Sequence, residues 1–240
     1  MIRFAEGSSA WKDFHDTVHQ ILAEKTSIKV AEIGGGANPL LSVDFVESHG
    51  LAYSILDISM EEMAKADPRY EKKVVDLQKP IVELPMQYDF IFSQMTMEHI
   101  QYPEQFYKNI FKLLNPGGQA LFFFANITSL PSMLNKLMPE SISERILLRL
   151  QPFRRGEKHG KFKAYYNWCF GPTRRSIGRF TRLGFSIKSY TGYFGHNYYS
   201  RIRPLQFLEN KKTKLLLKFP NAYACTYSHV LLEKPATAAI

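Results

Sequence analysis

Residues 30–41 read VAEIGGGANPLL, and the interpretation of the rest of the chain starts from this stretch. A short apolar run passes through an acid into three consecutive glycines, and Asn38 and Pro39 then stand where a helix is expected to begin. Glycines at such a turn let backbone amides approach a ligand, and the N-terminus of the following helix favours negative charge or hydrogen-bond acceptors. Taken alone, the pattern fits a dinucleotide, a phosphate or another nucleoside cofactor.

Two of these interpretations meet an obstacle in the sequence. The nicotinamide fingerprint G-x-G-x-x-G needs a glycine at position 39 for close packing of helix on strand, and the chain has Pro39. The phosphate-binding Walker pattern needs Gly-Lys-Ser/Thr after the turn, which does not follow here. A nicotinamide-dependent oxidoreductase is therefore disfavoured but stays as a rival hypothesis, together with a catalytically silent protein that keeps the fold for partner docking.

Short apolar runs alternate with helix-like segments along the chain, which indicates a parallel sheet with crossover helices. We predict one α/β domain, residues 1–240, with a doubly wound, Rossmann-like sheet of seven strands. An amphipathic helix is expected in the N-terminal segment 1–27, Asn38 is expected to cap a helix, and Pro103 to begin another. The expected strands are residues 28–33, 51–56, 72–77, 88–93, 119–125, 184–190 and 222–234.

The composition is that of an ordinary globular protein, with 45% hydrophobic and 22% charged residues in a chain of 240. The chain has neither a membrane-length apolar run nor a secretory signal, so we expect a cytoplasmic protein. Cys169 and Cys225 lie far apart and lack a CxxC partner. We expect buried free thiols rather than a disulfide or a zinc site, and no metal.

The net charge of +9 is concentrated in one segment. Residues 141–182 hold eleven basic and two acidic residues, whereas the remainder of the chain is balanced. We predict that residues 126–182 form an inserted cap over the substrate, helical at first and then basic and aromatic, and that 193–220 is an aromatic loop. The basic cluster favours an anionic acceptor, contact of the amphipathic stretch 133–150 with an anionic membrane, or RNA. The alternative is that the basic residues lie on a solvent-exposed helix face and have no binding function.

The motif Glu32-Ile33-Gly34-Gly35-Gly36 resembles the first motif of class I S-adenosylmethionine-dependent methyltransferases, in which an acid precedes a G-x-G turn. The third glycine of that motif is replaced here by Asn38. Asp57, at the end of the second expected strand, and Asp76-Leu77, at the end of the third, resemble further motifs of the family. The resemblance continues through YDFIFSQMTMEHI (88–100) and LLNPGGQALFFF (113–124), and extends more loosely to the last two strands.

The resemblance implies S-adenosylmethionine as the cofactor, S-adenosylhomocysteine as the product, and a seventh strand that runs antiparallel beside the sixth. Asp57 would accept the ribose hydroxyls, Asp76 would accept the adenine amine, and Leu77 would pack against the ring. The cofactor-binding residues that it implies are Glu32, Gly34, Gly35, Gly36, Asn38, Asp57, Ile58, Asp76, Leu77 and Gln94.

The expected reaction is methyl transfer to an oxygen, or less favourably a nitrogen, of a small-molecule, saccharide or lipid-linked acceptor that can be anionic. The segment FKAYYNWCFGPTRRSIGRFTRLGF (162–185) resembles bacterial methyltransferases that act on such acceptors. An alcohol acceptor gains from a positioned base, and the catalytic candidates are His99, Tyr166 and His196. RNA methylation is the lower-ranked alternative, because the fourth motif lacks the Asn/Asp-Pro-Pro-Tyr/Phe signature. Peripheral contact with the inner membrane is a further hypothesis.

Overall fold

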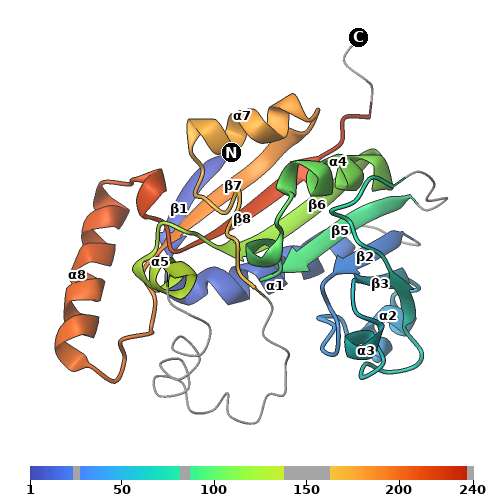
Figure 1. Cartoon of the computed structure of the whole chain (residues 1–240), viewed down its shortest axis with the longest axis horizontal. Helices are drawn as coiled ribbons and strands as arrows, with labels where there is room; N and C mark the ends of the chain where they lie inside the picture. The colour runs from blue at the N-terminus through green and yellow to red at the C-terminus, as the bar shows by residue number, and fades with distance from the viewer. Residues whose placement is uncertain (24–27, 82–86, 138–162, 237–240) are drawn as a thin grey trace.

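The computed structural model describes residues 1–23, 28–81, 87–137 and 163–236, and these form a sheet covered by helices on both faces (Figure 1). Eight described strands lie in the order β1-β7-β8-β6-β5-β2-β3-β4. This confirms the doubly wound, mostly parallel α/β class. The strands are β1 (Ile2–Glu6), β2 (Lys29–Ile33), β3 (Ala52–Asp57), β4 (Glu71–Val74), β5 (Tyr88–Gln94), β6 (Leu114–Ala125), β7 (Ser186–Phe194) and β8 (Tyr227–Glu233).

Helices α4 and α7 lie on one face of the sheet, and α1 lies on the other (Figure 1). Helix α1 buries Phe14, Val18 and Leu22 at helical spacing, as the sequence predicts. Pro103 begins α4, also as predicted. The described helical elements are η1 (Gly7–Ser9), α1 (Ala10–Ala23), α2 (Val43–Ser48), α3 (Met60–Met63), η2 (Met97–His99), α4 (Pro103–Leu113), α5 (Leu130–Leu137), α7 (Arg174–Arg182), α8 (Arg203–Lys218) and η4 (Ala222–Ala224).

Strand β8 runs antiparallel to both of its neighbours, β6 and β7, which confirms the expected antiparallel last strand. Every other strand pair in the described sheet is parallel. The carboxyl ends of the remaining seven strands therefore meet at one edge of the sheet. The loops that follow β2, β3, β4 and β5 lie at this edge, which is where open α/β sheets bind ligands.

The sheet has eight strands and not the expected seven, because residues 2–6 form an edge strand parallel to β7. The amphipathic helix expected in the N-terminal segment 1–27 is α1, Ala10–Ala23, and residues 24–27 lie outside the described residues. Strand β1 escapes sequence analysis because it is short and lies at the edge, with no residue that is fully buried. None of its five side chains is fully buried, so its assignment depends on its pairing with the distant β7.

Helix α8 occupies most of the region 193–220 that was expected to be an aromatic loop. Its buried residues are the polar Glu209 and Thr213, so the apolar residues do not follow the pattern of a core-facing helix. Pro204 in the first turn and the many Leu and Lys residues that follow are the signals that could have revealed it. The last expected strand, 222–234, is also shorter, because η4 occupies its first residues.

The insert 126–182 is described only in part. Its apolar stretch around Met133 and Leu134 forms α5, and its last basic residues form α7. Residues 138–162, which include most of the predicted basic and amphipathic stretch, lie outside the described residues. The substrate cap therefore stays a prediction.

The core beneath α4 is built from aromatic side chains. Phe122 of β6 is fully buried, and its ring centroid lies 6.0 Å from that of Phe106 and 5.1 Å from that of Tyr107. Both contacts are edge-on, which is a favoured aromatic geometry. Cys169 and Cys225 are buried free thiols, as predicted.

We predict that Phe122→Ala lowers the free energy of unfolding by about 3–5 kcal/mol, because it leaves a cavity among rings that cannot collapse onto it. Urea denaturation followed by circular dichroism measures this loss. The control is Phe207→Ala, since Phe207 is 59% exposed. It should change stability by less than about 0.5 kcal/mol, and equal losses for both variants would contradict the packing argument.

Candidate functional site

The glycine loop after β2 takes a shape that requires glycine. Gly34 has φ +76° and Gly36 has φ +44°, both in the left-handed region that residues with a Cβ rarely adopt. A Cβ on Gly34 would lie 2.3 Å from Oγ1 of Thr96, in the loop after β5. The Gly34 amide also donates to the Leu56 carbonyl at 2.9 Å. The first glycine thus lets the loops after β2 and β5 approach each other closely.

The buried side chain of Glu32 holds this loop by hydrogen bonds. Its buried Oε2 accepts a hydrogen bond from the Leu40 amide at 2.9 Å and another from the Tyr53 hydroxyl. Burial raises the pKa of the Glu32 carboxyl to about 7, against the opposing effect of these two donors. The carboxyl group therefore holds the backbone of the loop in place.

The predicted helix cap at Asn38 is wrong. Helix α2 begins at Val43, and its cap is Ser42, whose Oγ accepts from the Phe45 amide at 3.2 Å. Asn38 instead closes a turn, in which its amide donates to the Gly35 carbonyl at 2.9 Å. The Leu40 amide is bound to the Glu32 carboxylate, and the chain becomes helical only after Ser42. The cofactor-binding role of Asn38 stays a prediction.

Asp57, the last residue of β3, faces the glycine loop. A Cβ on Gly36 would point towards Asp57 and lie 3.5 Å from its Oδ2. The Asp57 Oδ1 accepts from the Ser59 amide at 2.9 Å. Burial raises the pKa of Asp57 above its ordinary value, with backbone donors opposing the rise. Ile58, also predicted as a cofactor contact, follows with its side chain 55% exposed.

Asp76 and Leu77 were expected to end a strand at 72–77, but β4 ends at Val74, and the two residues lie in the turn that follows. Helix α4 holds this turn. The side-chain amide of Asn109, fully buried, donates to the Leu77 carbonyl at 2.8 Å and to the Lys79 carbonyl at 2.7 Å. Asp76 accepts from the Gln78 amide at 3.0 Å and pairs with the Lys79 ammonium at 3.3 Å. Leu77 is buried, and its side chain belongs to the hydrophobic core.

Gln94, the last residue of β5, lies against α1. Its Oε1 is 3.0 Å from Nε2 of His15. The sequence gives no sign of this pair, because 79 residues separate the two positions. Only the packing of α1 on the sheet brings His15 to the edge where Gln94 was expected to face a cofactor.

These loops converge because β5, β2 and β3 are neighbours in the sheet. Adjacent strands are about 4.8 Å apart, so the loops that follow these three strands lie within about 10 Å of one another. The glycine loop, Asp57 and Gln94 thus share one edge, with the Asp76 turn after β4 next to them. Their roles towards a cofactor stay predictions from the resemblance, since the structure establishes only their proximity.

Two of the three catalytic candidates are also brought together. The amides of Tyr165 and Tyr166 both donate to the Glu98 carbonyl, at 2.7 and 2.9 Å. The neighbouring His99 has its Nδ1 3.1 Å from the Lys163 carbonyl. Residues 163–166 therefore lie across η2, and His99 and Tyr166 belong to one small structure at the carboxyl edge.

Glu98 is a central residue of this structure that sequence reasoning did not single out as a site residue. Its carboxyl group is buried, and Oε1 accepts from the Ala125 amide at 2.9 Å, at the end of β6. Its Oε2 has no hydrogen-bond partner among the described residues. Burial raises the pKa of the Glu98 carboxyl to about 7, although the Ala125 amide opposes the rise.

His196 lies elsewhere. Its buried imidazole follows β7, with Nε2 3.7 Å from Oε1 of Glu209 on α8. Burial lowers the pKa of His196, against the opposing effect of the Glu209 carboxylate. Strand β7 is four strand positions from β2, or about 19 Å. The structure therefore groups His196 with α8 and does not bring it to the glycine loop.

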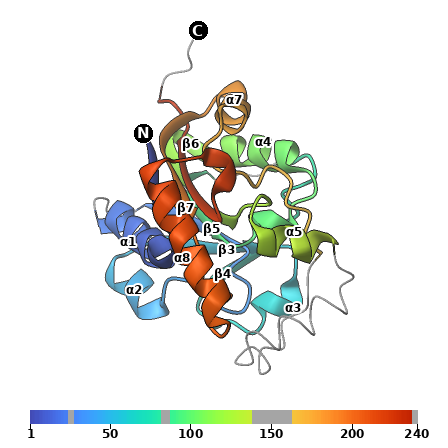
Figure 2. The same ribbon diagram turned by 90° about the vertical axis from the view of Figure 1, so that its left-hand side faces the viewer.

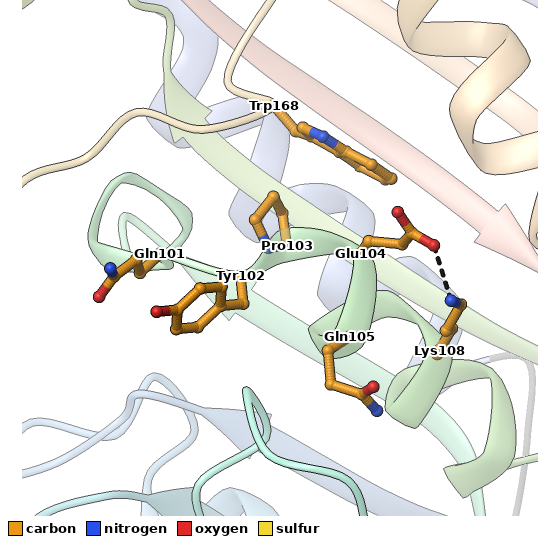
Figure 3. A pocket seen from close by; sticks show the side chains of 7 residues that line it. All are labelled: Gln101, Tyr102, Pro103, Glu104, Gln105, Lys108 and Trp168. Atoms are coloured by element: carbon orange, nitrogen blue, oxygen red, sulfur yellow. Dashed lines mark hydrogen bonds and ion pairs between the residues drawn. The ribbon is translucent and has the colours of Figure 1, made fainter.

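Two hollows lie next to the segment that follows Tyr166. The first, of about 350 Å³, lies at the start of α4, where Trp168 stands over Pro103 and Glu104 pairs with Lys108 (Figure 3). The second, of about 440 Å³, is basic and aromatic. Neither is lined by the glycine loop. The residues that line the second hollow are Pro103, Ile127, Lys136, Tyr166, Asn167, Trp168, Phe170, Arg175 and Arg179.

Comparisons with known proteins agree with this geometry. A family model described as a methyltransferase domain matches residues 4–163, which is more than half of the chain. The chain therefore belongs to this family of methyltransferase domains. S-adenosylmethionine is the cofactor of the family, as the sequence resemblance implies. A search of curated proteins found no match.

Solved structures with the same fold include the S-adenosylmethionine-dependent methyltransferase of Mesorhizobium loti. It has a TM-score of 0.53 and 17% identity, over 95% of this chain and 98% of that one. Haemonchus contortus phosphoethanolamine N-methyltransferase 2, solved with phosphomonomethylethanolamine and S-adenosylhomocysteine, has a TM-score of 0.54 and 18% identity, over 94% of this chain and 53% of that one. The [4+2]-cyclase SpnF has a TM-score of 0.51 and 13% identity, over 92% and 81%. At these identities the likeness establishes the fold.

The buried carboxyl of Glu98 predicts a pH-dependent stability. Its pKa is about 7 in the folded chain against 4.5 for the free side chain, so the unfolding free energy falls as the pH rises between these values. We expect Glu98→Gln to be close to the parent at pH 4 and more stable than the parent by roughly 2–3 kcal/mol at pH 8. Urea unfolding at both pH values measures the difference.

Glu104→Gln is the control for this experiment. Glu104 is exposed on α4, and its partner Lys108 lowers its pKa, so any effect has the opposite sign and is small. Other groups with a shifted pKa, such as Glu32, Asp57 and His196, titrate in the parent and in Glu98→Gln alike, so the difference between the two proteins isolates Glu98. A gain in stability of Glu98→Gln that is the same at pH 4 and pH 8 would refute the titration argument.

Proposed function

We propose that this methyltransferase transfers the methyl group of S-adenosylmethionine to an oxygen of an anionic small-molecule, saccharide or lipid-linked acceptor, with nitrogen as the less favoured atom. The observation that carries the proposal is the juxtaposition of two features at one edge of the sheet. One is the place where Gly36, which has no Cβ, faces the Asp57 carboxylate, which we call the notch, and the other is the basic, aromatic hollow beside Tyr166.

The residues at the notch fit the cofactor. Gly36 leaves the space in front of Asp57 free of a side chain, and the half-buried Asp57 carboxylate is suited to accept hydrogen bonds from ribose hydroxyls. The exposed Ile58 and the buried Leu77 offer apolar contacts. S-adenosylmethionine supplies an electrophilic methyl group on a sulfonium. Asp57, the glycine loop and the Asp76 turn would hold the cofactor so that this group faces the acceptor.

The second hollow fits an anionic acceptor. Lys136, Arg175 and Arg179 line it together with aromatic residues. The Arg179 guanidinium lies 5.0 Å from the Trp168 ring centroid, and its Nη1 is buried with no hydrogen-bond partner among the described residues. Burial lowers the pKa of Arg179, and Arg175 adds to the effect. A bound carboxylate or phosphate would satisfy this cation, because guanidinium groups bind such anions strongly.

The hollow is close enough to the notch for the two to act together. Ile127, which lines it, comes two residues after the end of β6. Strand β6 is two strand positions from β2, or about 10 Å. An acceptor whose anionic group lies in the hollow can therefore extend its nucleophilic atom towards the glycine loop.

His99 is the favoured base for an alcohol acceptor. The Lys163 carbonyl can only accept, so Nδ1 of the neutral ring carries the proton and donates to it. The basic lone pair is then on Nε2. The base is one contribution to methyl transfer, and alignment of the acceptor with the methyl group is another. An in-line displacement depends on the geometry of the two reactants.

The Haemonchus contortus neighbour supports the acceptor class, since it was solved with phosphomonomethylethanolamine, a phosphorylated molecule. That enzyme is an N-methyltransferase, which keeps nitrogen as the alternative acceptor atom here. RNA methylation and cofactor binding without catalysis remain the rival functions. Labelled S-adenosylmethionine incubated with fractionated cell lysate separates them, because the label enters a small molecule or lipid, enters RNA, or enters nothing.

We predict that Asp57→Ala weakens S-adenosylmethionine binding by about 1–3 kcal/mol, because the ribose hydroxyls lose a charged acceptor. Isothermal titration calorimetry measures the change. Asp67→Ala is the matched control, since Asp67 lies on the surface and pairs with Arg69. Unchanged affinity of Asp57→Ala would remove Asp57 from the cofactor site.

A second variant separates acceptor binding from cofactor binding. Arg175→Gln/Arg179→Gln should raise the KM for the labelled acceptor fraction by about tenfold to a hundredfold, because its anionic group loses charged donors. The dissociation constant of S-adenosylmethionine should stay unchanged. Arg182→Gln removes a charge from the same helix outside the hollow and serves as the control. Equal loss of cofactor and acceptor binding would point to a folding role for these arginines.

A further inference from the structure

Helix α8 turns its apolar residues away from the protein. Leu208, Leu215 and Phe219 at its end are 62%, 59% and 63% exposed, whereas the buried positions of the helix are Glu209 and Thr213. A surface helix of a globular protein ordinarily buries its apolar residues and exposes its polar ones. This helix does the reverse, so the exposed face needs an explanation outside the core.

The exposed apolar residues form one stripe. Spacings of seven and four residues place Leu208, Leu215 and Phe219 on the same side of a helix. Lysines border the stripe: the Lys218 ammonium lies 5.4 Å from the ring centroid of Phe219 at its end. Lys211 lies 5.3 Å from the ring centroid of Phe207, which is itself 59% exposed. We call Phe207, Leu208, Lys211, Leu215, Lys218 and Phe219 the α8 outer face.

The exposed charges of the segment that carries this face have one sign. Residues 201–219 contain six basic residues and one acid, and that acid, Glu209, is buried. Its Oε2 pairs with the Lys212 ammonium at 2.6 Å. The segment therefore presents basic and apolar side chains to its surroundings and exposes no carboxylate.

Polar contacts fix the orientation of α8. The Gln206 side-chain amide donates to the His196 carbonyl at 3.2 Å, and Glu209 faces the His196 imidazole. Gly195, with φ +84°, lets Thr213 approach, because a Cβ there would lie 2.4 Å from its Oγ1. A half-turn rotation of the helix would expose Glu209 and break these contacts. The outward stripe is thus built into the packing of the helix.

We propose that the α8 outer face binds the surface of an anionic lipid bilayer. Leucine and phenylalanine side chains would enter the boundary between headgroups and acyl chains, and the lysines would contact lipid phosphates. A protein partner fits less well, because lysine is depleted from the cores of protein interfaces and here borders the apolar stripe. Among the described residues, no helix has the length and hydrophobicity of a membrane span. The proposed contact of α8 is with the surface of the bilayer.

The position of α8 gives the docking a consequence. The helix contacts β1 and β7 and forms the outermost layer on the side that faces the viewer in Figure 2. Strand β7 ends at Phe194 on the same edge of the sheet as the glycine loop, and α8 follows that end. A bilayer bound to α8 lies next to the edge that carries the candidate site, which suits a lipid-linked acceptor. The membrane inference itself does not require methyl transfer.

Vesicle flotation tests the proposal with the full chain. We expect binding to vesicles of equal parts phosphatidylglycerol and phosphatidylcholine, and much weaker binding to phosphatidylcholine alone. Lys211→Glu/Lys218→Glu should weaken binding roughly thirtyfold or more, since each lysine contributes about a factor of five at an anionic surface. Leu208→Ser/Leu215→Ser should weaken binding at least about tenfold through lost insertion.

Two controls make the result specific to α8. Lys112→Glu reverses one charge at an exposed position of α4, and Val74→Ser removes one apolar side chain that is 52% exposed on β4. Both should bind vesicles like the parent, and circular dichroism should show all variants folded. Asp57→Ala should bind vesicles normally, which separates this inference from the cofactor site.

Three results would overturn the proposal. The first is vesicle binding that the α8 variants leave intact, which would assign it to the basic segment 141–182. The second is equal binding to neutral and anionic vesicles. The third is the absence of vesicle binding together with a dimer in sedimentation that Leu208→Ser/Leu215→Ser dissociates, because the face would then bind a second copy of the chain.

Discussion

The shape of the candidate site depends on a hydrogen bond between a buried carboxylate and a backbone amide. Glu32 lies inside the sheet, and its Oε2 binds the Leu40 amide, which ties the loop to the end of β2. The loop is non-helical until Ser42, and its two left-handed glycines, Gly34 and Gly36, lie at the edge opposite Asp57. The Asn38-Pro39 pair is compatible with an immediate helix start, so the local sequence alone does not specify this path.

A second buried carboxyl organises the proposed acceptor side by the same chemistry. Glu98 binds the Ala125 amide through its side chain, while its backbone carbonyl accepts from Tyr165 and Tyr166. Burial raises the pKa of both Glu32 and Glu98 to about 7. Ionising either buried carboxyl lowers the stability of the fold, and these are the two residues that order the loops of the candidate site. Groups with a strongly shifted pKa are commonly found at functional sites.

Helix α8 is also held by polar contacts, and these decide which of its faces is exposed. Its attachment through Gln206, Glu209 and Thr213 leaves no core position for the leucines, so they point outwards. The same edge of the sheet thus carries the notch, the basic hollow and, beyond β7, an apolar and basic helix face. For an enzyme whose acceptor is lipid-linked, this arrangement would place the bilayer and the site on one side of the molecule.

The sequence by itself determined strands β2 to β6, the glycine loop and the position of Asp57, although β4 ends earlier than expected. Local patterns encode these features: an apolar run followed by glycine, an acid at a strand end, and a proline that begins a helix. The antiparallel last strand was implied by the resemblance to class I methyltransferases and not by a local pattern. Strand β1, the outward face of α8, the pairing of His15 with Gln94 and the role of Glu98 were decided by the tertiary structure. Each depends on a partner far away in the chain, and no local pattern specifies which distant residue will lie opposite, because that follows from the packing of the whole sheet.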